Sequence, residues 1–247
     1  TGESPNLTKE DRKIIYSTAK YSVGDKAKII AGTGTYSTKE SIEYTKMAND
    51  IGVDGIMIVT PYYSKPSQFG ILKHFEEISK NTDLPIMAYN IPGRTATLIE
   101  IETLEKLVDD IGIHSIKDAV GDLEFSKNEL EALKGKVDIY SGNDAETIEF
   151  MKMGGKGVVS VASHVVGNEI YDLINHVLND EIESAEHLQN QLLPLFDLLF
   201  EEPSPGPVKY LLTKTWEDVG LPLMPITDIS SKLANKLLDN FQKIKNN

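Results

Sequence analysis

A lysine at the end of a short apolar segment is the residue of this sequence best placed to act as a nucleophile. Residues 113–118 read Ile-His-Ser-Ile-Lys-Asp, and a small polar turn follows them. When the flanks of such a segment are buried, desolvation disfavours the ammonium form of the lysine. The neutral amine of Lys117 can then attack a carbonyl carbon and form a Schiff base. On this segment alone, a lysine whose stem crosses apolar surface to reach solvent is the favoured interpretation, and the rest of the chain reverses that preference.

Phenol, guanidinium and hydroxyl groups follow other apolar segments of the chain. Tyr63 and Tyr89 supply phenols and Arg94 a guanidinium group, whereas none of the five histidines stands out as the base of a nucleophile. An amine near phenols suits carbonyl chemistry through an imine, with tyrosine transferring protons. No His, Asp and Glu residues have the spacing of metal ligands, so we expect no metal and no other cofactor. The polar groups occupy residues 32–35, 60–63, 89–95, 117–118, 141–144 and 160–163.

Apolar and amphipathic segments alternate along the chain, which predicts strands and helices in turn. Thr8 and the run Ser37-Thr38-Lys39-Glu40 have the composition of helix N-caps. The predicted strands span 27–32, 54–60, 85–90, 113–118, 137–141 and 157–161. The predicted helices after the first five strands span 38–51, 68–81, 101–110, 123–133 and 146–153, and the C-terminal helices span 168–179, 182–201, 208–217 and 229–244.

These strands are mostly apolar rather than alternating, which is typical of a parallel sheet covered on both faces. No Gly-x-Gly-x-x-Gly turn follows any of them, which disfavours a dinucleotide-binding sheet. We therefore predict an α/β protein of the (β/α)8 TIM-barrel class, with its polar groups at the C-terminal ends of the strands. We expect the first two strands and the first helix of the barrel to be absent from this chain. The predicted division is 1–165 as a partial barrel and 166–247 as its last helix and a C-terminal helical extension.

The net charge, the cysteine content and the apolar runs of the sequence limit the kinds of molecule that the protein is expected to bind. The formal net charge of −13 disfavours non-specific binding to nucleic acid or to an anionic membrane. The absence of cysteine excludes disulfides and thiol catalysis, and it fits a reducing cytoplasm, where we expect the protein to act. No apolar run approaches the roughly 18 residues that span a bilayer. Small-molecule substrates are therefore the expected partners.

Six segments resemble, in the same order and with matching spacing, motifs of the class I pyruvate-dependent lyase/synthase family. Within it, the chain is most similar to the branch that condenses pyruvate with aspartate semialdehyde, a step of lysine and diaminopimelate biosynthesis. The resemblance covers the whole chain, including the Pro-rich segment 203–209 and the C-terminal helices. The segments are Thr-Gly-Glu-Ser at 1–4, Ala-Gly-Thr-Gly at 31–34, Val-Thr-Pro-Tyr-Tyr-Ser-Lys-Pro at 59–66, Tyr-Asn-Ile-Pro-Gly-Arg-Thr at 89–95, Ile-Lys-Asp at 116–118 and Tyr-Ser-Gly-Asn-Asp at 140–144.

The resemblance implies three catalytic residues. Lys117 would form the Schiff base with pyruvate, and Tyr89 beside it would transfer protons during imine formation and cyclisation. Tyr63 would reach into the site of a neighbouring subunit and complete a relay of phenol and hydroxyl groups. The middle hydroxyl of that relay belongs, in the family, to a threonine immediately before the position of Thr1, and this sequence does not contain it.

The resemblance also implies five substrate-binding residues. Thr1 and Gly2 would hold the pyruvate carboxylate, partly through backbone N–H groups. Arg94 would bind the carboxylate of aspartate semialdehyde, for which a guanidinium fork is well shaped. Gly142 and Val159 would contribute main-chain carbonyl groups to the pocket.

Several consequences of the resemblance stay open. A related pyruvate aldolase, such as a sialic acid or sugar-acid lyase, and a catalytically inactive truncated remnant are the alternatives. The Gly-Arg-Thr run at 93–95 favours a short carboxylated aldehyde over a sugar acid. The family implies a homo-oligomer, a dimer of dimers. We expect weak or absent inhibition by lysine, because Lys9 and Tyr36 stand where sensitive bacterial enzymes tend to carry His and Asn.

Overall fold

The polypeptide forms two compact units, which we describe separately from a computed structural model of residues 1–246. The first, called the strand unit here, comprises Leu7–Gly142 and Met153–Lys156. The second, called the helical unit, comprises Thr1–Asn6, Asn143–Lys152 and the chain from Gly157 onward. A domain boundary between residues 165 and 166 stays a prediction.

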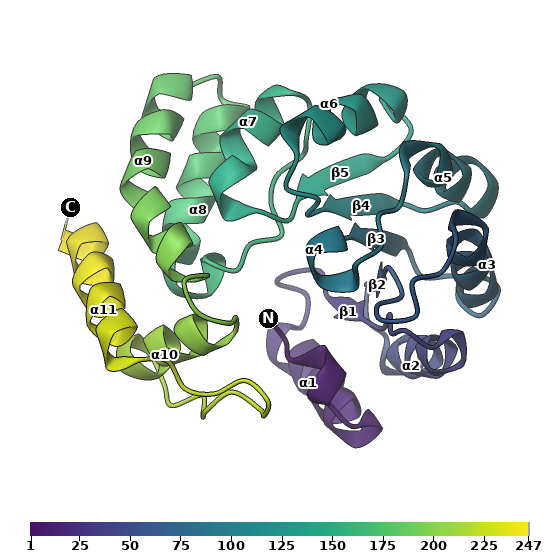
Figure 1. The fold of residues 1–247 in the computed structure, drawn as a ribbon, viewed down its shortest axis with the longest axis horizontal. Helices are drawn as coiled ribbons and strands as arrows, with labels where there is room; N and C mark the ends of the chain where they lie inside the picture. Colours follow the sequence, from purple (N-terminus) through teal and green to yellow (C-terminus); the bar gives the residue numbers. More distant parts are fainter. Residues whose placement is uncertain (247) are drawn as a thin grey trace. The chain divides into compact units, whose positions relative to one another are not determined.

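A parallel sheet forms the centre of the strand unit, with its strands in chain order from β1 to β5 (Figure 1). The middle strands, β2 to β4, pack apolar side chains on both faces, and Ile56, Ala88 and Ile116 are completely buried. This two-sided burial explains why their sequences read as continuous apolar runs rather than alternating ones. The strands are β1 (Ile30–Gly32), β2 (Gly55–Val59), β3 (Ile86–Asn90), β4 (Ser115–Asp118) and β5 (Asp138–Ser141).

Helices α2, α3, α5 and α6 follow one another along the sheet, each against its neighbour in the chain (Figure 1). Side-chain caps define where several of them begin. Thr8 and Asp11 form a complete capping box before α1, and Asp122 accepts two backbone N–H bonds at the start of α6. The helices are α1 (Lys9–Val23), α2 (Thr38–Ile51), α3 (Gln68–Ser79), α4 (Pro92–Thr95), α5 (Ile101–Lys106) with the π-helical turn η2 (Leu107–Ile111), and α6 (Leu123–Ala132).

The prediction of a sixth strand over 157–161 is wrong. Among the described residues the sheet has five strands, and of this segment only Val158 forms an isolated β-bridge. The backbone donors at its end are used otherwise: the N–H groups of Val161 and Ala162 both bind Asp144 Oδ2, at 3.1 Å each. A carboxylate thus takes the hydrogen bonds that a strand would place in a ladder, and a helix follows at once.

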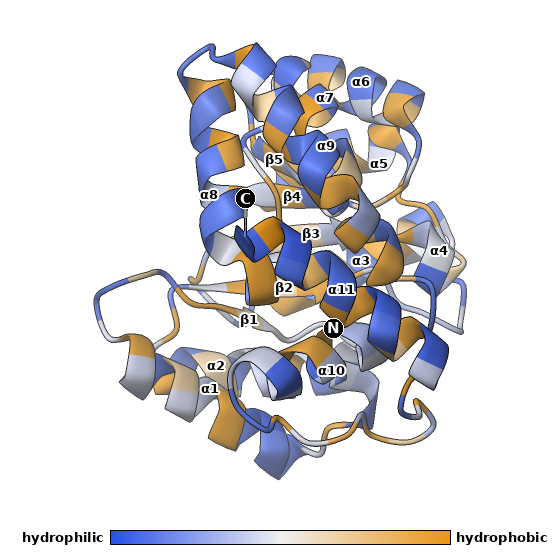
Figure 2. Ribbon diagram, turned by 90° about the vertical axis from the view of Figure 1, so that its left-hand side faces the viewer, coloured by the Kyte–Doolittle hydropathy of each residue, from blue (hydrophilic) through white to orange (hydrophobic). Residues whose placement is uncertain are grey.

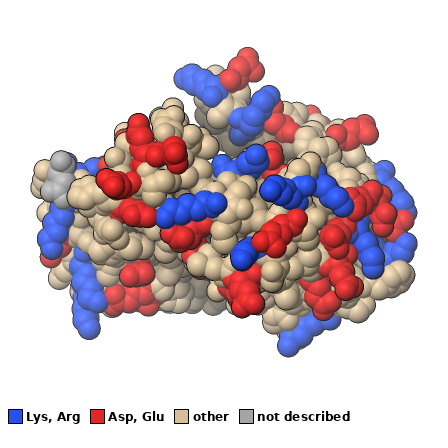
Figure 3. Space-filling view, turned by 90° about the horizontal axis from the view of Figure 1, so that it is seen from above, with Lys and Arg blue, Asp and Glu red and all other residues tan. Residues whose placement is uncertain are grey.

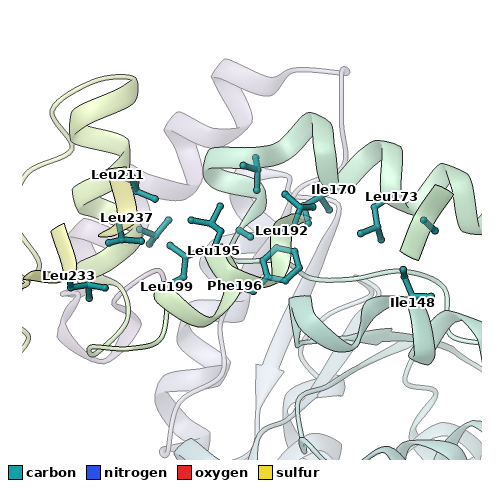
Figure 4. Close-up of a cluster of buried hydrophobic side chains, with 14 residues drawn as sticks. Ile148, Ile170, Leu173, Leu192, Leu195, Phe196, Leu199, Leu211, Leu233 and Leu237 are labelled. Atoms are coloured by element: carbon teal, nitrogen blue, oxygen red, sulfur yellow. The ribbon is translucent and has the colours of Figure 1, made fainter. Parts of the chain in front are cut away.

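Packed helices make up most of the helical unit. Apolar side chains from α7 to α11 form one buried cluster, in which Leu192, Leu195 and Phe196 of α9 are central (Figure 4). Each fully buried Leu or Phe contributes about 1.5–3 kcal/mol through burial. Figure 2 shows polar and apolar residues sharing helix α11, as expected for a helix with one face on the core. The elements are η1 (Ser4–Asn6), η3 (Asp144–Glu146), α7 (Thr147–Lys152), α8 (Ser163–Leu178), α9 (Ile182–Leu198), α10 (Gly206–Thr215) and α11 (Ser231–Asn246).

Acidic and basic side chains are interspersed on the face shown in Figure 3. Many of them pair, as Lys80 does with both Glu76 and Glu77. Within residues 1–246 we find no helix with the length and apolar character needed to cross a membrane.

Candidate active site

The register between β3 and β4 places Tyr89 directly beside Lys117. Side chains at paired positions of neighbouring strands leave the sheet on the same face. Lys117 is 9 % exposed, and its Nζ lies 4.1 Å from the centroid of the Tyr89 ring. On its other side Lys117 is the register partner of Tyr140 on β5. The sheet therefore places Lys117 in register with two tyrosines and its nearly buried amine against the ring of Tyr89.

Burial also sets the protonation of Tyr89. Desolvation raises the pKa of its phenol above the usual value, and the positive charge of Arg94 offsets part of that rise. The phenol therefore keeps its proton at neutral pH and can donate it. A buried proton donor next to an amine is the pairing that imine chemistry requires.

Gly142 packs closely against the end of the strand that bears Lys117. A Cβ at this position would lie 2.6 Å from Ala119 Cβ and 3.0 Å from Lys117 Cε. The N–H of Gly142 donates to the carbonyl oxygen of Asp118 at 2.5 Å. Only glycine fits this close approach, so residue 142 limits where the lysine side chain can lie.

Asn90, at the end of β3, fixes the loop that carries Arg94. Its side chain forms two hydrogen bonds with the backbone of Ile99, donating to the carbonyl oxygen and accepting from the N–H, both at 3.0 Å. Asn90 is completely buried, whereas Arg94 in the short helix α4 is exposed. The loop thus has a rigid base, and its guanidinium group is accessible.

Tyr63 does not join Tyr89 and Lys117 inside the strand unit. Its ring is 93 % exposed, and its backbone has a φ of 70°, a left-handed conformation that is uncommon for residues other than glycine. The neighbouring Tyr62 is half-buried and makes an edge-to-face contact with Tyr36, with 5.5 Å between the ring centroids. The loop after β2 therefore turns one tyrosine inward and presents the other to solvent.

Thr1, Gly2 and Val159 belong to the helical unit. Val159 follows the bridge residue Val158 in the sequence and is half-buried, whereas Thr1 and Gly2 are exposed. The residue after them is anchored, because Glu3 accepts a bond from Lys209 Nζ at 3.0 Å and one from the N–H of Leu223 at 2.5 Å. Both ends of this ion pair are largely buried. The ion pair therefore ties the first residues to helix α10.

Sequence reasoning missed the anchoring roles of Asn90, Glu3 and Asp118. Asp118 is 3 % exposed and accepts the N–H of Val120 at 2.8 Å and the hydroxyl of Ser126 at 2.5 Å. For Asn90 and Asp118 a signal was available, because each is a polar residue at the end of an apolar strand, and its side chain leaves the face opposite to that of Tyr89 or Lys117. In residues 1–246 no group of three or more His, Asp or Glu side chains could hold a metal ion.

Comparison with known proteins shows which family this chain resembles. The model of the dihydrodipicolinate synthetase family matches residues 1–244. A 4-hydroxy-tetrahydrodipicolinate synthase of Halalkalibacterium halodurans is 44% identical, over 92% of this chain and 78% of its own. The crystal structure of dihydrodipicolinate synthase from Bacillus anthracis is 40% identical with a TM-score of 0.93, covering 97% of this chain and 82% of that one. A monomeric dihydrodipicolinate synthase variant is 31% identical with a TM-score of 0.94, covering 98% of this chain and 82% of its own.

Proposed function

This chain belongs to the dihydrodipicolinate synthetase family, and we propose that it condenses pyruvate with aspartate 4-semialdehyde through a Schiff base on Lys117. The product would be 4-hydroxy-tetrahydrodipicolinate, a precursor in lysine and diaminopimelate biosynthesis. Membership of the family makes the chain an enzyme of the class I aldolase type, and its five parallel strands with their helices match part of the TIM-barrel fold of its structural relatives. One observation carries the proposal: the nearly buried amine of Lys117 lies 4.1 Å from the centroid of the Tyr89 ring.

The chemistry proceeds from that pair. The amine of Lys117 attacks the keto carbon of pyruvate, and loss of water from the resulting carbinolamine gives the imine. The leaving hydroxyl needs a proton, which the phenol of Tyr89 donates, and the nitrogen must lose one. Because burial raises the pKa of the Tyr89 phenol, the group holds its proton until the reaction demands it. Lys117 and Tyr89 thus form one proton-transfer unit.

Five further residues would bind the substrates. Thr1 and Gly2 would hold the pyruvate carboxylate, and Glu3 supports that role because it anchors their backbone through Lys209. Arg94 would bind the carboxylate of aspartate semialdehyde. Its guanidinium group is exposed on a loop that Asn90 holds in place, which supports a role in binding the incoming substrate. Gly142 and Val159 would supply main-chain carbonyl groups to the pocket.

Tyr63 would act in the site of a second copy of the chain. Its 93 % exposure supports this, because a phenol that is exposed in its own subunit is available to another. A homo-oligomer, in the form of a dimer of dimers, is therefore part of the proposal. The location in the cytoplasm stays a prediction.

The test is chemical capture of the imine. The protein is incubated with pyruvate and borohydride, and its intact mass and peptide map are measured. We expect one reduced pyruvyl adduct, on Lys117 and absent from K117A, whereas K136A, which changes an exposed lysine, keeps it. A folded protein without the adduct would contradict imine chemistry and favour an inactive remnant. If the protein forms the adduct but turns over sugar acids and not aspartate semialdehyde, the result would favour the sugar-acid lyase.

A further inference from the structure

Two carboxyl groups are buried together behind the strand that carries Lys117. Side chains alternate along β4, so Lys117 and Asp118 leave opposite faces of the sheet. Asp118 is 3 % exposed, and Glu129 of α6 is completely buried. Ser126, one turn before Glu129 on the same helix, is buried as well and donates to Asp118 Oδ2. The pair therefore lies between the sheet and helix α6, where solvent cannot stabilise two charges.

Glu129 is a buried carboxyl group without a donor partner. Neither of its carboxyl oxygens accepts a hydrogen bond from an N–H or O–H group within residues 1–246. Glu129 follows Ser126 by one turn of α6, and Ser126 contacts Asp118, so the Glu129 carboxyl group lies on the helix face that meets Asp118. A buried carboxyl group without a donor avoids the cost of an unpaired charge by keeping its proton, and the protonated acid can donate to a neighbouring carboxylate.

The surroundings place that proton on Glu129. Burial raises the pKa of both groups, and that of Glu129 lies well above its usual value because the charge of Asp118 adds to the effect. Asp118 is favoured as the anion, because the hydroxyl of Ser126 and the N–H of Val120 both donate to it. Asp122, the other charged group acting on Asp118, is also acidic. With the proton on Glu129, the negative charge of the pair resides on Asp118.

We propose that Glu129 is a positioning residue whose carboxylic acid donates a hydrogen bond to the Asp118 carboxylate and so fixes the strand end that presents Lys117. The proposal deepens the function proposed above and rests on Lys117 being the nucleophile. It also extends to the neighbouring strands, because the backbone of this strand end bonds both. The N–H of Ala119 donates to Asn90 on β3 at 2.9 Å, and the carbonyl of Asp118 accepts from Gly142 after β5 at 2.5 Å.

The position of the amine is the quantity that this contact would control. Displacing a reacting group by about 1 Å can cost on the order of a hundredfold in rate. Asp118 is the residue next to Lys117, and both its side-chain oxygens and its carbonyl are engaged. Loss of the Glu129 donor would free one side of that residue and leave the bonds from Ser126 and Val120.

Three variants distinguish the effect of the hydrogen-bond donor at residue 129 from the effects of side-chain size and charge. E129Q keeps the length of the side chain and a donor, but it cannot ionise. E129L fills a similar volume without a donor. E131Q changes an exposed glutamate two residues along α6 and serves as the control. The rate of borohydride-trapped imine at Lys117, kcat, and KM for pyruvate are measured for each.

We expect E129L to slow imine formation by at least about tenfold, with kcat falling and KM changing little. E129Q should stay within about threefold of the wild type, as E131Q does. A general loss of structure would lower the melting temperature and raise KM together, which this pattern excludes. Wild-type imine rates in E129L would overturn the positioning role, and so would equal losses in E129Q and E129L.

Infrared spectroscopy tests the proton without using the reaction. At neutral pH the wild type and E131Q should show a carbonyl band of a protonated carboxylic acid that E129Q lacks. Absence of that band in the wild type would overturn the proposal even if catalysis followed the expected pattern. Should Lys117 trap no pyruvate in the wild type, the proposed function fails, and the infrared band still decides whether Glu129 carries the proton.

Discussion

At the scale of single residues, Tyr89 and Lys117 depend on each other. The amine of Lys117 lies over the ring of Tyr89, so the phenol can exchange protons with a carbonyl compound bound to that amine. Removing the hydroxyl of Tyr89 leaves the ring and the burial in place. Y89F should therefore slow imine formation by about 10²–10⁴-fold, the contribution of a positioned acid–base group. Rapid-quench trapping with borohydride measures this, and an unchanged rate would exclude Tyr89 as the proton donor.

Gly142 offers a second test at this scale. The side chain of alanine in G142A would meet Ala119 Cβ at 2.6 Å and Lys117 Cε at 3.0 Å, so the strand end or the lysine must shift. We expect kcat to fall at least about tenfold. G167A is the matched control, because the Cβ added at Gly167 on α8 has no neighbouring atom within 4 Å. Steady-state kinetics measure both variants, and similar activity for G142A and the wild type would contradict the close approach.

A site residue could be predicted when the sequence around it was sufficient to place it. Lys117 and Tyr89 stand at the ends of apolar runs, and parallel pairing of those runs brings them together. The pairing of Asp118 with Glu129 was missed, because it depends on which face of α6 meets the sheet. The three-residue spacing of Ser126 and Glu129 was the available sign that both lie on that face.

At the scale of elements, His74 joins helices α2 and α3. Its Nδ1 and the hydroxyl of Thr38 are 2.9 Å apart, and its Nε2 is buried without a hydrogen-bond partner among the described residues. Burial lowers the pKa of His74 from 6.5 to about 4. The unfolded chain therefore binds more protons than the folded one between these values. Stability rises with pH across that window and is lost as the pH falls from 6.5 towards 4.

Replacing His74 should remove part of this pH dependence. For the wild type we expect the free energy of unfolding to decrease by roughly 2–3 kcal/mol between pH 6.5 and 4 through this residue. H74N should show a flatter profile in urea titrations across that range, whereas H187N, which changes an exposed histidine, should follow the wild type. Parallel profiles for H74N and the wild type would contradict the assignment.

Helix α10 anchors the start of the chain through Lys209. Without its amine, Glu3 loses a largely buried partner, and the backbone of Thr1 and Gly2 is less restrained. K209A should therefore raise KM for pyruvate several-fold and change kcat less, as expected when binding of the carboxylate weakens. K214A, an exposed lysine on the same helix, should leave both constants unchanged. Equal effects of the two variants would indicate a general loss of charge.

Most elements were predictable, and each of the two failures has a physical cause. Thr8 and Ser37 cap helices as their sequences indicate, and β1 to β5 lie within the predicted strands. The segment 157–161 has strand composition but gives its donors to Asp144, a long-range contact that composition does not reveal. The short helix α4 was also missed, because its four residues are too few for a periodic pattern.

At the scale of the whole molecule, Tyr63 connects the fold to assembly. If its phenol acts in a second copy, Y63A and K117A each disable a different part of the shared site. Mixed oligomers of the two variants should regain up to about a quarter of the dimer's wild-type activity, because some sites then contain both intact residues. Activity of re-associated mixtures measures this. Mixtures as inactive as either variant alone would place Tyr63 outside the partner's site.

The buried pair of Asp118 and Glu129 also bears on how this protein can be improved or can evolve. Replacing a buried ionisable group by an apolar one of similar size is often neutral or stabilising. A laboratory selection for heat resistance would thus accept leucine at position 129, and a selection for turnover would discard it. Opposite outcomes of the two selections would show that thermal stability and turnover favour different side chains at position 129.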